Sequence, residues 1–360
     1  MSAPVTGARR VPSTWRPAQA LGPYGLLLLT ILLIIFFSVL LPSTFPTPLN
    51  LRAILSDKSI VAFLSLAAMI PLSTNKFDLS IGFGIGLAHI LVIGLQVQFG
   101  VPWPLAVLAV LFIGLLVGTI NGVLVEAAQI DSFIATLGTG SILYAISFAY
   151  TGGQQIVGTL PPQFIAINGF APFGIPAPAI YVLALGVVLW LAFEFLPIGR
   201  YMYAIGSNPR AAELSGIPKH RYVIFAFAAS GLITALAGVV LGSKLQIGQA
   251  NVGNEFLLPA FVGALLGSTA IKVGRVNVWG TLVAVAVLAV GISGIEQLGS
   301  SFFVEPLFNG TTLLIAVGLA GFAARRRVRA GLREDERAME AARDAANETD
   351  ENQAGEGKET

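Results

Sequence analysis

The sequence predicts an all-α integral membrane protein, a polytopic bundle of about ten transmembrane helices. Hydrophobic residues make up 55% of the 360 residues and charged residues only 11%, and the mean hydropathy is +0.80. Soluble domains carry roughly 25% charged residues, so the soluble class is excluded. The charges also gather at the N-terminus, between the apolar runs and in the C-terminal tail. The interiors of the runs therefore suit the hydrocarbon core of a bilayer.

Each predicted span is a mostly apolar run close to the roughly 20 residues that cross a bilayer as a helix. The runs cover approximately 24–41, 59–74, 79–99, 103–125, 132–150, 178–196, 222–242, 256–271, 277–298 and 305–323. They define a transmembrane domain of 24–323, with a short segment 1–23 before it and a charged, partly disordered tail 324–360 after it. The Gly- and Pro-rich stretch 151–177 is too polar to cross and predicts an external loop or short surface helix.

Orientation follows from Lys and Arg, which concentrate on the cytoplasmic side of membrane proteins. With ten spans and a cytoplasmic N-terminus, the basic residues of 197–221 and 272–275 lie inside, whereas Arg52, Lys58 and Lys244 lie outside. Both termini are then cytoplasmic. Broken or re-entrant segments are expected near 74–82 and 256–276, and a count of eight full crossings would also fit.

Small residues recur at four-residue spacing in several runs, which allows two helix backbones to approach closely. The clearest series is Gly114, Gly118 and Gly122. We expect such positions to pack helices tightly within one subunit, which favours a compact bundle over a wide pore.

Few residues of this chain are suited to catalysis or metal binding. It has no Cys and two His, and it lacks the HExxH and P-loop patterns, so neither a catalytic residue nor a metal ligand is predicted. Energy must then come from a partner or an ion gradient. The second source, an ion-coupled secondary carrier for a small polar solute, stays open as an alternative. The ionisable residues expected near the membrane are Asp78, His89, Glu126, Asp131, Glu194 and Glu296. All except His89 are expected at span ends, where water reaches them; His89 is expected to be a neutral packing residue.

The long polar loop 197–221 between two apolar runs carries the most specific pattern. Its segment Gly199–Ile217 resembles the cytoplasmic loop of bacterial ABC permeases of the ribose, galactose and xylose importer type. Asp78–Gly82 is similar to the "IDLSVG" of that family, and Asp131–Gly138 with Tyr150–Gly153 is similar to its "PFIVTLGT" and "YTGG". The resemblance extends over about 60–322.

The resemblance implies a permease subunit of an importer for a monosaccharide or related polyol in the bacterial cytoplasmic (inner) membrane. It implies a dimer with a second permease copy or a paralogue, two ABC ATPase subunits, and a periplasmic or lipid-anchored sugar-binding protein. Such a chain binds no cofactor, because the ATPase partner uses the ATP and Mg²⁺, and it is not itself an enzyme. Membrane lipids surround it, and no nucleic acid is expected.

Within the loop, the capping pattern predicts a short helix that docks on the ATPase. Asn208 is a good N-cap, Pro209 suits the first helical position, and Gly216 ends the helix. A helix of about two turns is marginal alone in water, which favours a partner groove. Ala211, Ala212, Leu214 and Ile217 are expected to supply packing surface, and Arg210 and Glu213 polar contacts. The complete predicted coupling set is Ser207, Asn208, Pro209, Arg210, Ala211, Ala212, Glu213, Leu214, Gly216 and Ile217.

A second predicted site surrounds Asp78. Asp78 and Ser80 either cap the helix that begins there or line the sugar path or its inner gate together with freed backbone groups. Because sugars are neutral polyols, hydroxyl and amide side chains are the expected lining. The candidates are Asn75, Asp78, Ser80, Asn121, Thr136, Thr139 and Gln246. Lys76 and Lys272 stand where the family has small or apolar residues, which predicts either a more basic gate or a substrate that differs from a simple pentose.

Overall fold

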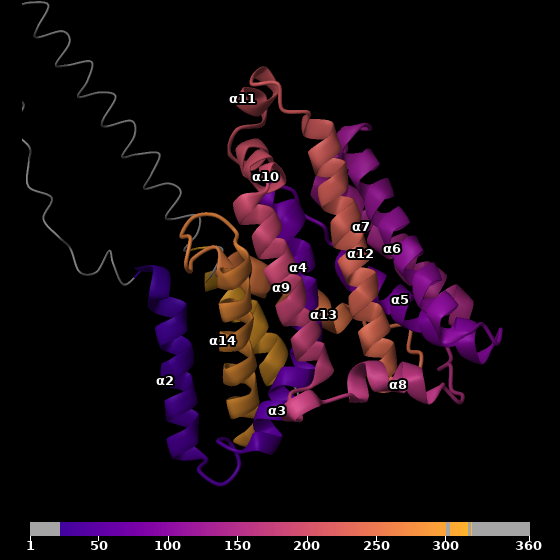
Figure 1. The fold of residues 1–360 in the computed structure, drawn as a ribbon, viewed down its shortest axis with the longest axis vertical. Helices are drawn as coiled ribbons and strands as arrows, with labels where there is room; N and C mark the ends of the chain where they lie inside the picture. Colours follow the sequence, from indigo (N-terminus) through magenta and orange to yellow (C-terminus); the bar gives the residue numbers. More distant parts are fainter. Residues whose placement is uncertain (1–21, 300–302, 316–317, 319–360) are drawn as a thin grey trace, which may run out of the picture.

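The computed structural model describes residues 22–299, 303–315 and 318, which form an all-helical bundle (Figure 1). The helices are η1 (Gly22–Tyr24), α2 (Gly25–Leu40), α3 (Pro48–Asp57), α4 (Ser59–Ser73), α5 (Ser80–Val97), α6 (Trp103–Glu126), α7 (Ser132–Thr151), α8 (Pro162–Gly169), η2 (Pro172–Gly174), α9 (Ala177–Phe195), α10 (Pro197–Ser207), α11 (Pro209–Leu214), α12 (Lys219–Leu245), α13 (Asn254–Gly267) and α14 (Val278–Gln297). Residues 304–315 are also helical.

Seven helical segments in the described part of the chain are long and apolar enough to cross a membrane. They are 48–73, α5, α6, α7, α9, α12 and α14, and the apolar helices α2 and α13 are shorter. These nine, with the helix at 304–315, correspond to the ten predicted runs and confirm a polytopic all-helical membrane protein. Most of the segment 1–23, the tail 324–360 and the end of the last predicted span lie outside the described residues.

The two ends of the bundle differ in character (Figure 1). The beginning of α2 lies at the same end as α10 and α11, whereas α3 and α8 lie at the opposite end. The expected external stretch 151–177 contains α8 and an isolated antiparallel bridge between Ile156 and Gly248. This arrangement agrees with placing the beginning of α2 and the polar loop on one side of the membrane.

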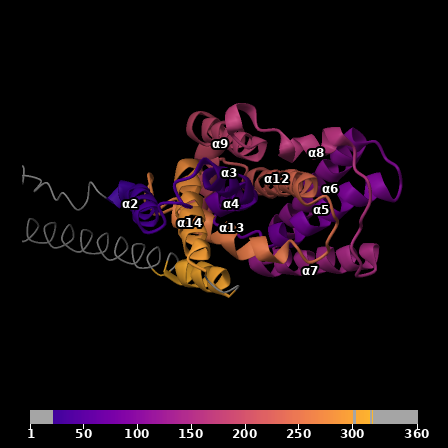
Figure 2. The same ribbon diagram turned by 90° about the horizontal axis from the view of Figure 1, so that it is seen from below.

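The core forms around α4, in which every residue except Leu72 is buried. Its side chains pack with buried residues of α9, α12, α13 and α14 in one apolar cluster. Figure 2 shows these helices arranged around α4, with α2 at one edge of the bundle. A helix that is apolar on all sides is expected at such a central position.

Glycines bring α6 and α12 into close contact. A Cβ atom on Gly118 would meet the carbonyl oxygen of Phe227, and one on Gly231 would meet the carbonyl oxygen of Gly114. The expectation of tight packing at the four-residue series is therefore confirmed here.

Both predicted interruptions are present. Residues 74–79 separate α4 from α5, with Asn75 at φ 59°, and residues 268–277 follow α13, with Ile271 at φ 58°. α13 has 14 residues and so extends about 21 Å, less than the roughly 30 Å hydrocarbon core. Non-helical backbone within a membrane protein is stable where it packs against protein, as the stacking of Phe77 on Phe261 illustrates.

Candidate functional site

The helix predicted within the polar loop is present as α11, and its ends are fixed as the sequence indicates. The Asn208 side chain accepts a hydrogen bond from the Ala211 N–H at 3.1 Å, and Pro209 occupies the first helical position. Gly216 has φ 79°, and the N–H groups of Gly216 and Ile217 donate to the carbonyls of Glu213 and Ala212. These bonds close a helix of only six residues, which α10 presents at one end of the bundle (Figure 1).

The predicted packing residues of α11 divide between the protein's own core and solvent. Ala212 is buried against Ile205 of α10 and Val223 and Phe227 of α12, and Ile217 packs on the same cluster. Leu214 is 84% exposed, and Arg210 and Ala211 are also exposed. Ala212 and Ile217 therefore hold α11 against α10 and α12, and Leu214 leaves apolar surface exposed. Ser207 lies in the joint with α10, where its hydroxyl donates to the Tyr203 carbonyl at 2.7 Å.

A chain of ion pairs ties the base of α11 to α6 and α12. Lys219 lies 2.9 Å from Glu213 and 3.0 Å from Glu126, and Nδ1 of His220 lies 3.2 Å from Glu126. The hydrogen bond from Lys219 lowers the pKa of Glu213. The sequence analysis missed the involvement of Glu126, which is 1% exposed rather than reached by water as expected. The loop places Lys219 and His220 above the end of α6, and only the fold reveals this proximity.

The second site is a buried polar cluster around Asp78, which is 1% exposed and thus also not reached by water. Its Oδ1 accepts from the Ser80 backbone N–H at 3.2 Å and from the Ser80 hydroxyl at 2.6 Å. Its Oδ2 accepts from the Ser230 hydroxyl of α12 at 2.8 Å, and Asn121 of α6 donates to the Ser80 hydroxyl at 2.8 Å. Asp78 therefore binds Ser80, the first residue of α5, and links this helix to α12.

α7 binds the non-helical segment 74–79 through two hydroxyl groups. The Ser132 hydroxyl accepts from the Phe77 N–H at 3.1 Å, and the Thr136 hydroxyl accepts from the Leu79 N–H at 3.0 Å. Two backbone donors freed by the break are thereby satisfied, as burial requires. The structure thus brings four of the predicted path residues together: Asp78, Ser80, Asn121 and Thr136.

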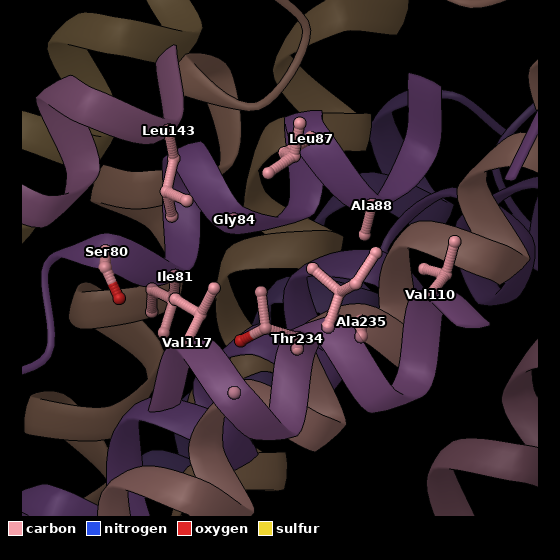
Figure 3. Close-up of a pocket in the computed structure, with 13 residues that line it drawn as sticks. Ser80, Ile81, Gly84, Leu87, Ala88, Val110, Val117, Leu143, Thr234 and Ala235 are labelled. Atoms are coloured by element: carbon pink, nitrogen blue, oxygen red, sulfur yellow. The ribbon is translucent and has the colours of Figure 1, made fainter. Parts of the chain in front are cut away.

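A small cavity adjoins this cluster between α5, α6, α7 and α12 (Figure 3). Figure 3 shows the Ser80 and Thr234 hydroxyls among the apolar side chains of Leu87, Val117 and Leu143. Its volume of about 20 Å³ is enough for one water molecule but not for a monosaccharide. At this volume the space between these helices does not admit a sugar.

The other predicted path residues lie apart from the cluster. The Thr139 hydroxyl donates to the Ala135 carbonyl of its own helix at 3.0 Å. Gln246 ends α12 at φ 57° and is exposed, at the end of the bundle opposite α11. Their role along a path stays a prediction.

Asn75 lines a polar cavity of about 300 Å³ beside α10, together with Ser207, Ser268 and Arg275. The Arg275 guanidinium lies 4.6 Å from the centre of the Tyr203 ring, and the Tyr203 hydroxyl donates to the Val276 carbonyl at 2.9 Å. Burial raises the pKa of Tyr203 to about 12. The cavity connects the two interruptions of the bundle with the base of the loop.

Lys272, which departs from the family pattern, is paired with Glu194. His89 is fully buried, and its Nε2 accepts from the Gln249 N–H at 3.3 Å, in keeping with the expected packing role. Among the described residues no group of three or more His, Cys, Asp or Glu is placed to hold a metal ion.

The comparisons with known proteins agree with this geometry. The family described as "Branched-chain amino acid transport system / permease component" matches residues 50–319. The chain belongs to this family. It is a permease subunit of an ATP-binding-cassette importer, and the predicted resemblance is confirmed.

Individual relatives match most of the chain. The ribose import permease protein of Bacillus subtilis is 35% identical over 301 residues, which are 83% of this chain and 92% of the relative. The corresponding protein of Haemophilus influenzae is 31% identical over 290 residues, 80% of this chain and 89% of the relative. The autoinducer 2 import system permease protein of Escherichia coli is 31% identical over 280 residues, 76% of this chain and 84% of the relative. No solved structure matches the chain.

Proposed function

We propose that this permease imports a monosaccharide or related polyol that an extracytoplasmic binding protein delivers, and that ATPase subunits dock on α11. Family membership supports an importer driven by a partner ATPase and not the alternative of an ion-coupled carrier. The chain itself is proposed to be non-catalytic. It would lie in the bacterial cytoplasmic membrane with both termini and α11 in the cytoplasm, in agreement with the positions of the basic residues.

The docking proposal rests on the way α11 is capped, packed and exposed. A helix of six residues is unstable in isolation, yet this one is capped at both ends and seated on Ala212, while Leu214 stays 84% exposed. Such a helix can bind a groove of the ATPase through its outer face. It can transmit force to the membrane helices through its packing on α10 and α12. The docked surface would comprise Arg210, Ala211 and Leu214, with the Glu213 carboxylate beside them.

A pathway between two permease copies is supported by the lack of room for a sugar beside the Asp78 cluster of one copy. The cavity beside the Asp78 cluster has a volume of about 20 Å³, too small for a sugar. A route at a dimer interface needs no such cavity. α7 exposes an apolar surface that includes Phe133, Ile134 and Ile142, and it suits a second copy or a paralogue as well as lipid.

The substrate is proposed from the relatives, whose names include ribose and autoinducer 2. The test is uptake by proteoliposomes that contain the permease, its ATPase and its binding protein. A panel of labelled pentoses and hexoses, together with autoinducer 2, should give ATP-dependent accumulation of at least one compound. Accumulation driven by an ion gradient without the ATPase would contradict the proposal.

The docking role is tested at Gly216, whose φ of 79° disfavours a β-branched residue. Gly216→Val should distort the end of α11 and reduce ATP-driven uptake at least tenfold. Gly216→Asn is the matched control, because Asn tolerates this backbone region, and it should retain most of the uptake. Equal uptake by both variants would remove the support for α11 as the docking element.

A further inference from the structure

A cavity of about 480 Å³ lies between α2, α4, α9 and α14, with α3 at the end opposite α11. Its walls are almost wholly apolar and include Ile34 of α2, Ile54 of α3, Leu183 of α9 and Ala286 of α14. Ile34 is 43% exposed and Leu183 is 55% exposed, so the cavity opens to the surroundings of the bundle. In a membrane protein those surroundings are acyl chains.

The few polar groups in this lining already have partners. The Thr30 hydroxyl donates to the Leu26 carbonyl at 2.8 Å, and the Ser59 hydroxyl donates to the Leu55 carbonyl. Lys58 is paired with Glu305 at 2.9 Å. Ordered water and sugars both need several free hydrogen-bonding groups, which this lining does not offer. The cavity therefore suits a hydrocarbon occupant and is unsuited to the transported polyol.

A cation stands at the rim of the cavity. Arg52 lies on α3 between the lining residues Leu51 and Leu55, and its guanidinium lies against Gly174, next to the lining residue Ile175. Arg52 is exposed, and no acidic side chain in the described part of the chain forms an ion pair with it. The nearby Lys58 and Asp57 are each paired with another residue, Glu305 and Lys244. Arg52 is thus available to an external anion.

We propose that this cavity holds one acyl chain of an anionic phospholipid whose phosphate is bound by Arg52. Unfilled apolar space forfeits dispersion contacts, which an inserted acyl chain restores. Guanidinium groups bind phosphate oxygens through paired, charge-assisted hydrogen bonds. The arrangement of an apolar cavity with a cation at its open end therefore matches both parts of one lipid. The proposal is independent of the substrate and of the docking role of α11.

The test is native mass spectrometry of the full-length permease released from nanodiscs of phosphatidylglycerol and phosphatidylethanolamine. The wild-type chain should retain one phosphatidylglycerol. Arg52→Gln should lower the retained fraction at least fivefold, whereas Arg52→Lys should preserve most of it. Ala286→Trp, which fills the cavity, should abolish retention, and Leu108→Trp on the exposed face of α6 should not.

Arg52→Gln alters an exposed side chain and should leave folding intact, so its result stands even if Ala286→Trp fails to fold. Monodisperse elution of each variant checks this point. The proposal is overturned if the wild-type chain retains no phosphatidylglycerol, for example because another part of the chain fills the cavity. Retention that is unchanged in Arg52→Gln, or equal for phosphatidylethanolamine, also overturns it.

Discussion

α11 and the Asp78 cluster both lie at polar interruptions between long apolar helices, yet one is exposed and the other is buried. The Asp78 carboxylate, which is 1% exposed, accepts from hydroxyl groups of α5 and α12, and side chains of α6 and α7 bond to Ser80 and to the backbone beside it. At α11, the polar groups cap the helix locally, and the largest apolar side chain, Leu214, is 84% exposed.

The difference shows how to tell residues that stabilise the fold from residues that are available to bind another protein. Buried polar groups must be satisfied within the chain, since an unpaired one costs about 1 to 3 kcal/mol. The Asp78 cluster meets that demand with helices far apart in the sequence. α11 is held on its inner side by Ala212 and by the ion pair of Glu213 with Lys219, and its outer face, which includes Leu214, stays exposed. Changes in the first region should therefore affect stability, and changes in the second should affect partner binding.

The largest effect is expected for Asp78→Ala. The substitution leaves the buried hydroxyls of Ser80 and Ser230 without their acceptor and should lower the free energy of unfolding by about 3 kcal/mol. Denaturant titration in mixed micelles measures this free energy of unfolding. Asp131→Ala is the matched control, because Asp131 caps α7 but is exposed, and it should cost about 1 kcal/mol. Equal losses would show that burial does not distinguish the two carboxylates.

A smaller effect is expected for Ser230→Ala, which removes one of the hydrogen bonds to Asp78. The free energy of unfolding should fall by about 1.5 kcal/mol, because the carboxylate keeps its bonds from Ser80. Ser215→Ala removes a hydroxyl that donates to the Ala211 carbonyl on the exposed α11 and should change stability by less than about 0.5 kcal/mol. The same titration compares the two variants. A larger loss for Ser215→Ala than for Ser230→Ala would contradict the account.

The smallest effect on stability is expected for Leu214→Ala, which should stay within about 0.5 kcal/mol of the wild type. Affinity for the ATPase should nevertheless fall about tenfold, as for a well-packed apolar contact worth about 1.4 kcal/mol. Titration of the labelled ATPase into permease nanodiscs measures this affinity. A stability loss above about 2 kcal/mol with unchanged affinity would assign Leu214 to the protein's interior.

The sequence predicted the transmembrane helices well because each is a continuous apolar run. The run 178–196 became α9, Ala177–Phe195, and the capping residues Asn208 and Gly216 located α11. α3 was missed because ten amphipathic residues resemble a loop, although Thr47 before Pro48 is a helix start signal.

Long-range polar contacts were beyond the sequence. Ser230 lies 152 residues from Asp78, and Lys219 reaches Glu126 only because α6 and α12 pack through their glycines. The expectation that water reaches Asp78 and Glu126 was wrong for the same reason. Position near a span end says nothing about which neighbouring helices cover the residue.

The central claim is that α11 connects this permease to its ATPase. Its most direct test replaces Asn208–Ile217 with a Gly/Ser loop of equal length and measures ATPase binding and ATP-driven uptake in proteoliposomes. A control replaces 170–175, at the opposite end of the bundle, in the same way. We predict that the first variant loses both ATPase binding and uptake and that the control retains ATPase binding. ATPase binding and uptake by the first variant at the wild-type level would contradict the account.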